Sequence, residues 1–371
     1  MTSPAPFDIF LVAAPGLEAV VAAEARAKGF GTAIAVKGGV TLTGTWPDVW
    51  RANLELRGPS KILARIGEFR VLHLAQLDKR ARKVAWGDVL QPDVPFRVEA
   101  ACSNSRIYHS GAAAERIERA ICETLGAPAD RQAEVTVMAR INDDLCTVSI
   151  DTSGEPLHKR GHKQAVAKAP MRENMAACFL SLCGYDGSET VVDPMCGSGT
   201  FVIEAAEIAA GLKPGRSRRF AFEQLATFDA GAWQRLLGSP AAHTSASRFF
   251  GSDHDAGAVR MSIANAQRAG VDAMTEFQQC AIKDLTAPDG PPGLVIVNPP
   301  YGERIGDRGH LNALYVSLGQ TLRWNFKGWR AGLITSEPSL ANATGLSFTQ
   351  KSAPVSHGGL RVRLFQTGQL A

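Results

Sequence analysis

Short apolar runs alternate with amphipathic stretches along the whole chain, and their spacing predicts a mixed α/β protein. In the first 152 residues, runs of strand length occur at 7–13, 33–43, 60–71, 96–101, 134–140 and 145–151. Apolar residues recur at helical spacing over 17–28, 46–56, 74–86 and 113–125. The order of these elements predicts two small α+β units.

From about residue 171, strands and helices alternate one by one, which is typical of a parallel sheet. Strands are expected at 190–193, 249–253, 277–281, 294–297, 330–336 and 360–367. Helices are expected at 171–183, 200–210, 256–269 and 311–326. The second half of the chain is therefore predicted to form one α/β domain.

The strand at 294–297 is followed at once by Asn298-Pro299-Pro300-Tyr301. Prolines cannot donate to a sheet, so they end the strand. Ligands of open α/β sheets bind at the carboxyl ends of the strands. There, an amide and a carbonyl can accept two hydrogen bonds from an NH2 group while a tyrosine stacks on the ring that carries it. The motif predicts a seat for the exocyclic amine of a nucleobase, although a plain Pro-Pro turn is the alternative for the motif taken alone.

A glycine turn follows the strand that ends at Asp193, in the order Pro194-Met195-Cys196-Gly197-Ser198-Gly199-Thr200. Glycines let a backbone approach a ligand at a helix amino end. A dinucleotide fingerprint requires a third glycine where Val202 stands. A carboxylate at Asp193 would also repel a pyrophosphate, but it suits the ammonium group of an amino acid. S-adenosylmethionine is therefore the expected cofactor.

Further acids follow the next strands. Asp253 is placed to accept hydrogen bonds from ribose hydroxyls, with Asp255 as a close competitor, and Asp284 to contact the adenine amine. The distance along the chain from Gly199 to Asp253 indicates an insertion at 213–248. The residues expected to bind the cofactor are Asp193, Pro194, Cys196, Gly197, Gly199, Thr200, Asp253, Asp284 and Asn298.

Charge and composition narrow the function classes. Residues 56–172 hold 19 Lys and Arg against 14 Asp and Glu, whereas the rest of the chain is nearly balanced. This local excess predicts contact with a polyanion. The candidate contacts are Arg106, Lys159, Arg160 and Lys163 in this region and Arg216 and Arg218 in a second basic run at 213–219. No apolar run of membrane length, basic leader or Cys-x-x-Cys pair occurs, so we expect a cytoplasmic protein without metal or membrane contact, acting as a monomer.

Asp193-x-x-x-Gly197-x-Gly199 together with Asn298-Pro-Pro-Tyr301 resembles the class I S-adenosylmethionine-dependent amino-methyltransferases. The longer motif 298–304, with Leu157-His158-Lys159-Arg160-Gly161 and the basic run 213–219, is similar to the bacterial THUMP-containing RNA guanine-N2 methyltransferases. His162 and His357-Gly358-Gly359-Leu360 depart from that family, where tyrosine and Asn-Gly-x-Leu are usual.

The resemblance implies a C-terminal Rossmann-like class I methyltransferase domain at 171–371 whose last strand runs antiparallel. It also implies a ferredoxin-like domain at 1–56, a THUMP-type RNA-binding domain at 57–152 and a basic linker at 153–170. The expected catalytic residues are Asn298, Pro299, Pro300 and Tyr301.

The implied reaction is methylation of the N2 amine of guanine in RNA. The expected substrate is 23S ribosomal RNA, and transfer RNA is the nearest alternative. Open alternatives are a protein glutamine N5-methyltransferase, DNA adenine methylation and a non-catalytic RNA-binding assembly factor.

Overall fold

The computed structural model describes residues 5–164, 171–238, 248–302 and 308–371. Glu303 and Arg304, which continue the Asn-Pro-Pro-Tyr motif, lie outside the described residues. The contacts divide the chain into two compact units. Unit 1 comprises the described residues of Met1–Ala13, Val21–Leu157 and Arg218–Ser239, and unit 2 those of Ala14–Val20, His158–Ser217 and Pro240–Ala371.

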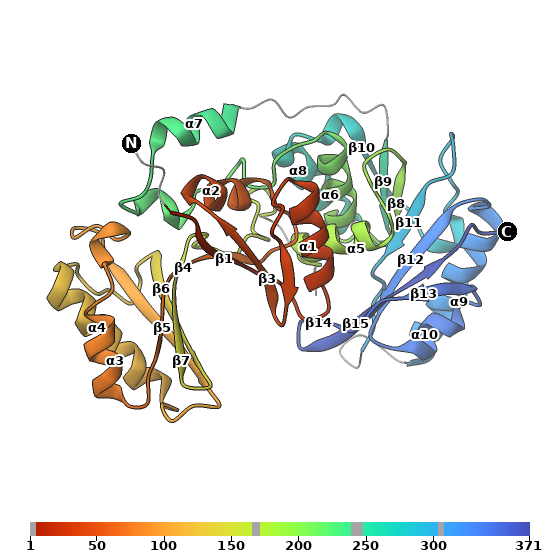
Figure 1. Ribbon diagram of the computed structural model, residues 1–371. Helices are drawn as coiled ribbons and strands as arrows, with labels where there is room; N and C mark the ends of the chain where they lie inside the picture. The colour runs from red at the N-terminus through yellow and green to blue at the C-terminus, as the bar shows by residue number, and fades with distance from the viewer. Residues whose placement is uncertain (1–4, 165–170, 239–247, 303–307) are drawn as a thin grey trace. The chain divides into compact units, whose positions relative to one another are not determined.

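Unit 1 is built on a seven-stranded sheet with the order β2-β3-β1-β4-β7-β6-β5 (Figure 1). All neighbouring strands are antiparallel except β5 and β6. The strands are β1 (Phe7–Val12), β2 (Ile34–Val36), β3 (Gly39–Gly44), β4 (Lys61–Arg70), β5 (Phe96–Ser103), β6 (Val135–Asn142) and β7 (Leu145–Asp151).

The helices of this half begin and end where local chemistry predicts. In α2 (Trp46–Glu55), Asp48 accepts a hydrogen bond from the Thr45 N–H at 2.9 Å and closes the first turn. α3 (Leu74–Ala81) and α4 (Ser110–Leu125) each follow a histidine that caps them: His109 Nδ1, for example, accepts from a backbone N–H at 3.0 Å. α4 ends at Gly126, whose φ of +84° favours glycine. The remaining helix is α1 (Glu18–Ala27).

Residues 218–238, which are part of the insertion expected at 213–248, pack inside unit 1. Phe222 lies 6.2 Å from Trp50 of α2 and 5.0 Å from Trp233 of α7 (Ala230–Gly238), measured between ring centroids. Phe220 stacks on Phe222 at 5.1 Å. Residues 218–238 therefore contribute aromatic side chains to the core of the unit that the N-terminal part of the chain builds.

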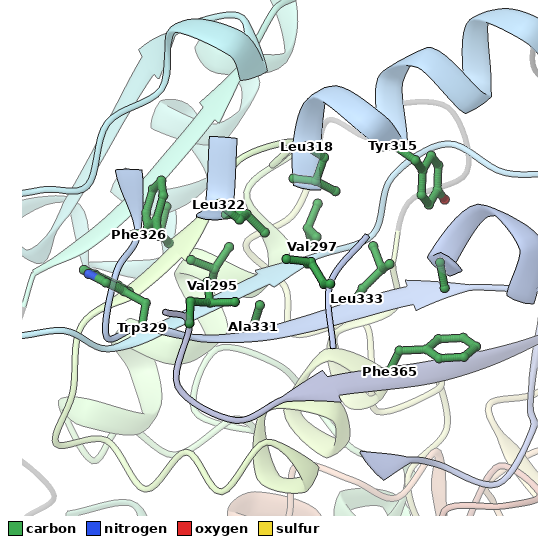
Figure 2. Packing of buried hydrophobic residues seen from close by; sticks show 14 of the residues in the cluster. Val295, Val297, Tyr315, Leu318, Leu322, Phe326, Trp329, Ala331, Leu333 and Phe365 are labelled. Atoms are coloured by element: carbon green, nitrogen blue, oxygen red, sulfur yellow. The ribbon is translucent and has the colours of Figure 1, made fainter. Parts of the chain in front are cut away.

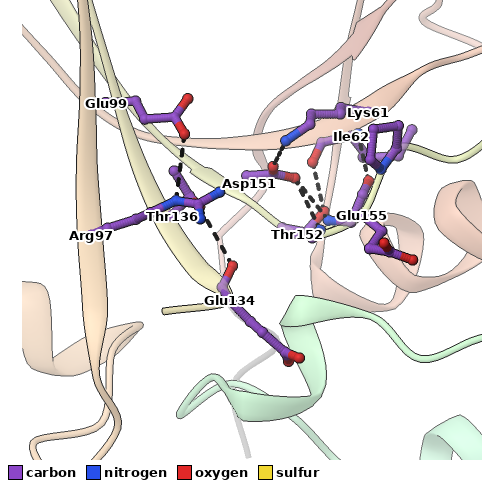
Figure 3. A network of polar contacts seen from close by, with 12 residues as sticks. Lys61, Ile62, Arg97, Glu99, Glu134, Thr136, Asp151, Thr152 and Glu155 are labelled. Atoms are coloured by element: carbon purple, nitrogen blue, oxygen red, sulfur yellow. Dashed lines mark hydrogen bonds and ion pairs between the residues drawn. The ribbon is translucent and has the colours of Figure 1, made fainter. Parts of the chain in front are cut away.

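A buried polar network closes β4 against the end of β7 (Figure 3). The Asp151 side chain is fully buried and pairs with Lys61, and its Oδ1 accepts from the Ser153 N–H at 3.0 Å. Thr152 Oγ1 donates to the Ile62 carbonyl at 2.7 Å. Burial raises the pKa of Asp151, and the ammonium group of Lys61 acts in the opposite direction.

Unit 2 contains a second sheet, in the order β10-β9-β8-β11-β12-β15-β13, with β14 paired to β15. The five strands from β10 to β12 run parallel and β15 is antiparallel to β12, which confirms the expected direction of the last strand. The strands are β8 (Val191–Asp193), β9 (Phe249–Asp253), β10 (Thr275–Gln279), β11 (Leu294–Val297), β12 (Arg330–Thr335), β13 (Phe348–Lys351), β14 (Val355–His357) and β15 (Leu360–Thr367).

Helices cover both faces of this sheet (Figure 1). α5 (Glu173–Leu182), α6 (Thr200–Ala209) and α8 (Ala256–Ala269) lie together on one face, and α9 (Arg308–Asn325) and α10 (Pro338–Ala343) on the other. Figure 2 shows Val295 and Val297 of β11 packed against Leu318 and Leu322 of α9. Because β11 is also buried on its other face, its four residues are all apolar.

The sequence located most elements to within a few residues. The helix expected at 74–86 ends earlier, at Ala81, and a 3-10 turn at Trp86–Asp88 follows. The strand expected at 277–281 is β10, two residues earlier in the chain. The short elements α7, α10, β13 and β14 were not predicted. In the described part of the chain, no helix combines the length and hydropathy needed to cross a membrane.

Candidate active site

The side chains at the ends of the parallel strands meet at one edge of the unit 2 sheet. β9, β8 and β11 are neighbours and run parallel, so their carboxyl ends share that edge. Asp253 ends β9, Asp193 ends β8, and Asn298 follows β11 directly. Val295 pairs with Val192, which sets the ends of β11 and β8 side by side. The fold thus brings the predicted carboxyl and amide groups to adjacent strand ends.

Asp193 is a buried carboxyl beside the glycine turn. It is 2% exposed, and its Oδ1 accepts a hydrogen bond from the Met195 N–H at 3.1 Å. Burial raises the pKa of Asp193 to about 8; the Met195 N–H lowers it and the charge of Asp253 adds to the rise. A cation placed next to this group would favour its ionised form. Asp193 is therefore suited to receive an ammonium group.

The glycine turn is fixed by side chains from β9 and α8. Asp253 Oδ2 accepts from the Gly197 N–H at 3.0 Å, and Ser262 Oγ donates to the Gly197 carbonyl at 3.0 Å. Asn265 Nδ2 donates to the Ser198 carbonyl at 3.0 Å. Ser262 and Asn265 are both fully buried and lie three residues apart on the same face of α8. The turn is thereby held in place at the amino end of α6.

Two residues of the turn have specific steric and electrostatic surroundings. Gly199 has a φ of +82°, and a Cβ added there would lie 3.1 Å from Ser262, so only glycine fits without strain. Cys196 is buried with its Sγ 3.7 Å from Ser262 Oγ. Burial strongly raises the pKa of the Cys196 thiol, so the thiol stays protonated and is a poor nucleophile.

The acids at the next strand ends differ in their surroundings. Asp253 is 8% exposed, and its Oδ1 accepts from the Asp255 N–H at 3.0 Å. Asp255 caps α8 by accepting from the Gly257 N–H at 2.7 Å. Asp284 lies exposed in a 3-10 turn (Ile282–Asp284) after β10. Helix capping accounts for Asp255, and Asp253 is the acid that is built into the edge of the site.

The Asn298 amide carries an unused acceptor. Within the described part of the chain, its Oδ1 is buried and has no hydrogen-bond partner. An unsatisfied buried acceptor is unfavourable by about 1–3 kcal/mol, so it calls for an explanation. Tyr301 is half-buried against the core cluster, and burial raises its pKa to about 12. The tyrosine is therefore neutral, and its uncharged ring lies three residues after the amide in the same turn.

Two buried or half-buried side chains bracket the peptide groups on either side of Tyr301. The hydroxyl of Tyr315, on α9, donates to the Pro300 carbonyl at 3.2 Å. The Glu337 Oε1, just beyond β12, accepts from the Gly302 N–H at 2.9 Å. Tyr315 is fully buried. These two bonds hold the backbone on either side of Tyr301, at the carboxyl end of the Asn-Pro-Pro-Tyr turn.

Four of the six predicted RNA-binding residues bond to other groups of the protein, and the structure does not support phosphate contact for them. They are Arg160, Lys163, Arg216 and Arg218. The Arg160 side chain is 2% exposed and lies 3.4 Å from Glu204, which is 1% exposed. Lys163 is 9% exposed and donates to Thr200 Oγ1 and to the Met171 carbonyl, both at 2.9 Å. Within the basic motif at 157–163, Arg160 and Lys163 are thus anchored inside the protein, whereas Lys159 is exposed.

The insertion's basic run is also engaged within the protein. Arg216 pairs with Glu207 at 2.6 Å, and the Glu207 side chain is fully buried. The guanidinium of Arg218 donates to the carbonyls of Ser153, Glu155 and Pro156 at 2.6–3.1 Å. Both arginines serve packing. Of the six predicted contacts, only Arg106, whose side chain is 69% exposed, and Lys159 are exposed.

Sequence reasoning missed the residues that support the site. Ser262 and Asn265 are polar residues on the inward face of an amphipathic helix, a pattern that could have identified them. Glu337 follows a parallel strand at the same sheet edge, so the reasoning that selected Asp193 also applies to it. Tyr315 cannot be distinguished from an ordinary core aromatic in the sequence.

Three domain families match the chain. The description "RMKL-like, methyltransferase domain" matches residues 160–364, "RlmL ferredoxin-like domain" residues 8–63 and "THUMP domain" residues 73–151. The resemblance inferred from the motifs and the predicted domain classes are confirmed by these matches.

Known proteins align with nearly the whole chain. A curated relative from Syntrophotalea carbinolica, named ribosomal RNA large subunit methyltransferase K/L, is 34% identical over 97% of this chain and 53% of its own length. The chain thus spans about half the length of that relative. The crystal structure of SMU.472, titled as a methyltransferase complexed with SAH, has a TM-score of 0.90 and 28% identity over 100% of both chains. A Listeria monocytogenes protein titled as a predicted N6-adenine-specific DNA methylase has a TM-score of 0.89 and 28% identity, and the alignment covers 98% of this chain and 97% of that one.

Proposed function

The chain belongs to the family of RMKL-like methyltransferase domains, and on this premise we propose that it transfers a methyl group from S-adenosylmethionine to the N2 amine of a guanine in RNA. Ribosomal RNA of the large subunit is the proposed substrate, in line with the name of the Syntrophotalea relative. The observation that carries the proposal is the buried, unpartnered Oδ1 of Asn298 at the end of β11.

The residues at the sheet edge fit the cofactor. Asp193 would receive the ammonium group of the methionine moiety, because its buried carboxyl gains from an adjacent cation. The Gly197–Gly199 turn would carry the cofactor at the amino end of α6, with Pro194, Cys196 and Thr200 shaping the turn. Asp253 would accept from the ribose and Asp284 from the adenine amine. Bound S-adenosylmethionine supplies an electrophilic methyl group on its sulfonium.

The protein's own part in the reaction is to orient a weak nucleophile. The lone pair of the guanine amine is delocalised into the ring, so its N–H bonds must be held and its developing positive charge stabilised. Asn298 Oδ1 and the Pro299 carbonyl would accept these two N–H bonds, with Pro300 closing the turn. Tyr301 would stack on a base that has left its helix, as bases read or modified by proteins commonly do.

The predicted domain plan supports RNA as the partner. We propose a ferredoxin-like domain at 1–56, a THUMP-type RNA-binding domain at 57–152, a basic linker at 153–170 and the catalytic domain at 171–371. Arg106 and Lys159 are retained as phosphate contacts because both are exposed. We further propose that the protein acts in the cytoplasm as a monomer and that methyl transfer needs no metal ion.

Asn298→Ala tests the proposal directly. We expect methyl transfer to ribosomal RNA to fall by about 10²–10³-fold, because one preorganised partner of the reacting group is removed. The affinity for SAH should change little, since the other cofactor contacts remain. Asn325→Ala is a matched control, because it also removes a side-chain amide, one that donates to the Leu285 carbonyl and is not among the residues assigned to the base or the cofactor. Unimpaired transfer by Asn298→Ala would contradict the role assigned to Asn298, and a wild-type chain that binds RNA but transfers no methyl group would favour a non-catalytic RNA-binding role.

A second candidate comes from the Listeria neighbour, whose title names adenine in DNA. Adenine also presents a planar exocyclic amine, so the same turn would fit it. Incubation with labelled S-adenosylmethionine and separate ribosomal RNA, transfer RNA, DNA and protein, followed by nucleoside mass spectrometry, distinguishes these acceptors. Label in N2-methylguanosine from ribosomal RNA is the expected result, and label in DNA or in glutamine would overturn it.

A further inference from the structure

One groove in unit 1 combines a basic helix face with an open strand edge. It has a volume of about 650 Å³ and is lined on one side by Ile66–Phe69 of β4 and on the other by α3 and the residues that follow it. All of its lining residues belong to unit 1. We call it the α3 groove.

The helix side of the α3 groove is a stripe of polar and cationic residues. Gln76, Lys79 and Arg80 are spaced i, i+3 and i+4, so they share one face of α3, and Lys83 in the turn after α3 lines the same side of the groove. In the described part of the chain, no carboxylate lies within ion-pair distance of the three cations. By contrast, Arg82 points away from the groove. It pairs with Asp78 and with Glu123 of α4. The groove face therefore keeps its positive charge.

The strand side of the groove offers backbone groups and a ring. β1 pairs with β4 only from Lys61 to Ala64, whereas β7 continues to Arg70. Beyond Ala64, that edge of β4 has no partner strand among the described residues, so its N–H and C=O groups are open. Phe69 is half-buried and lines the floor. Glu68 also lines the groove, and its Oε2 accepts from the Thr147 hydroxyl of β7 at 3.2 Å.

We propose that the α3 groove binds a single-stranded segment of the RNA substrate. Its phosphates would follow Lys79, Arg80 and Lys83, and a base would stack on Phe69. Cations that track a backbone beside an aromatic ring are the combination that recognises single strands. An acidic peptide would match the charge, but it has no flat ring to place on Phe69. The inference rests on the proposed function, because it assigns the site that holds the same substrate.

The test uses the full chain and a fluorescent 12-nucleotide oligouridylate as the probe, titrated by anisotropy across a range of salt concentrations. The groove variant is Lys79→Gln/Arg80→Gln/Lys83→Gln. Its control is Lys28→Gln/Lys37→Gln/Arg131→Gln, which removes the same charge from exposed positions outside the groove. At about 0.7 per phosphate contact, the salt slope of the groove variant should fall by about 2, and its affinity at 0.1 M salt by about 100-fold. The control should lose less than threefold.

Phe69→Leu separates stacking from charge. It keeps an apolar side chain, so we expect the affinity for the oligouridylate to fall by about fivefold or more while the salt slope stays unchanged. Twelve-residue oligoglutamate should compete weakly. The inference is overturned if the groove variant binds like its control. It is also overturned if oligoglutamate competes as well as RNA and Phe69→Leu has no effect, which would assign the groove to an acidic peptide.

The groove assignment and the proposed methyltransferase function can fail independently of each other. If the wild-type chain transfers no methyl group to RNA but the groove variant loses affinity, the proposed function fails and the groove assignment stands. If transfer occurs and the groove variant binds normally, the groove assignment fails alone. For an active enzyme, the groove variant should raise KM for RNA with kcat and the affinity for SAH unchanged.

Discussion

Tyr315→Phe should slow methyl transfer without weakening cofactor binding. The substitution removes the hydroxyl that donates to the Pro300 carbonyl at 3.2 Å, while the ring keeps its place in the core cluster. The loss of one neutral hydrogen bond is worth about 0.5–1.5 kcal/mol. If the bond acts by holding the turn in its reactive geometry, this energy appears in the barrier, and kcat falls by about 2- to 13-fold.

The assay is single-turnover transfer at saturating RNA, with SAH affinity and thermal unfolding measured in parallel. Tyr185→Phe is the matched control, because its hydroxyl also donates to a backbone carbonyl, that of Ala205, at 2.8 Å. Both variants should lose similar stability, but only Tyr315→Phe should lose rate. Glu337→Ala should behave like Tyr315→Phe, and Glu337→Gln should recover much of the rate because an amide oxygen can still accept from Gly302. Equal rates for Tyr315→Phe and Tyr185→Phe would refute the positioning role.

Three further predictions follow from buried charges. The pKa of Asp193 is raised to about 8, so binding of an ammonium-bearing ligand below that pH must release the proton of its carboxyl group. SAH affinity, measured by calorimetry, should therefore rise by up to about tenfold per pH unit until pH 8. Asp193→Asn should abolish this pH dependence. Arg160→Met should lower the free energy of unfolding by about 3–5 kcal/mol, since it leaves the buried Glu204 carboxylate without this guanidinium, and Arg160→Met/Glu204→Leu should recover most of it in urea titrations; an effect on RNA affinity alone would contradict the packing role. Lys61→Met should destabilise the chain most at neutral pH and least in acid, because the raised pKa of Asp151 means that its buried carboxyl is readily neutralised as the pH falls; a destabilisation independent of pH would contradict this coupling.

The placement of polar groups at the strand ends could be predicted from sequence because two independent rules agree there. Apolar runs give the strands, and a parallel sheet requires their ends to meet, so Asp193, Asp253 and Asn298 could be placed together before any contact was known. The sequence left Asp253 and Asp255 as alternatives for the ribose contact, and the capping of α8 by Asp255 could not be foreseen, because it depends on where α8 begins.

Basic residues were the weak point of the sequence interpretation. Arg160, Lys163, Arg216 and Arg218 look like a cationic surface because a sequence shows charge but not burial. Glu204, the partner of Arg160, lies more than 40 residues away in the sequence. Glu207, the partner of Arg216, is nearer, but it lies on α6, whose periodicity indicated only a core-facing helix. The α3 groove shows the converse, because Lys79, Arg80 and Lys83 were recognised as basic but were not singled out as a site.

The aromatic packing of the insertion has a consequence for how the chain acquires its structure. Trp50 of the N-terminal part finds Phe222 and Trp233 only after more than 230 residues have been synthesised. A ribosome-bound or truncated product that stops near residue 157 would leave these aromatic surfaces uncovered and prone to association. Unit 1 should therefore complete its core only after residue 233 has been synthesised, and a single splice near residue 157 would separate these aromatic partners.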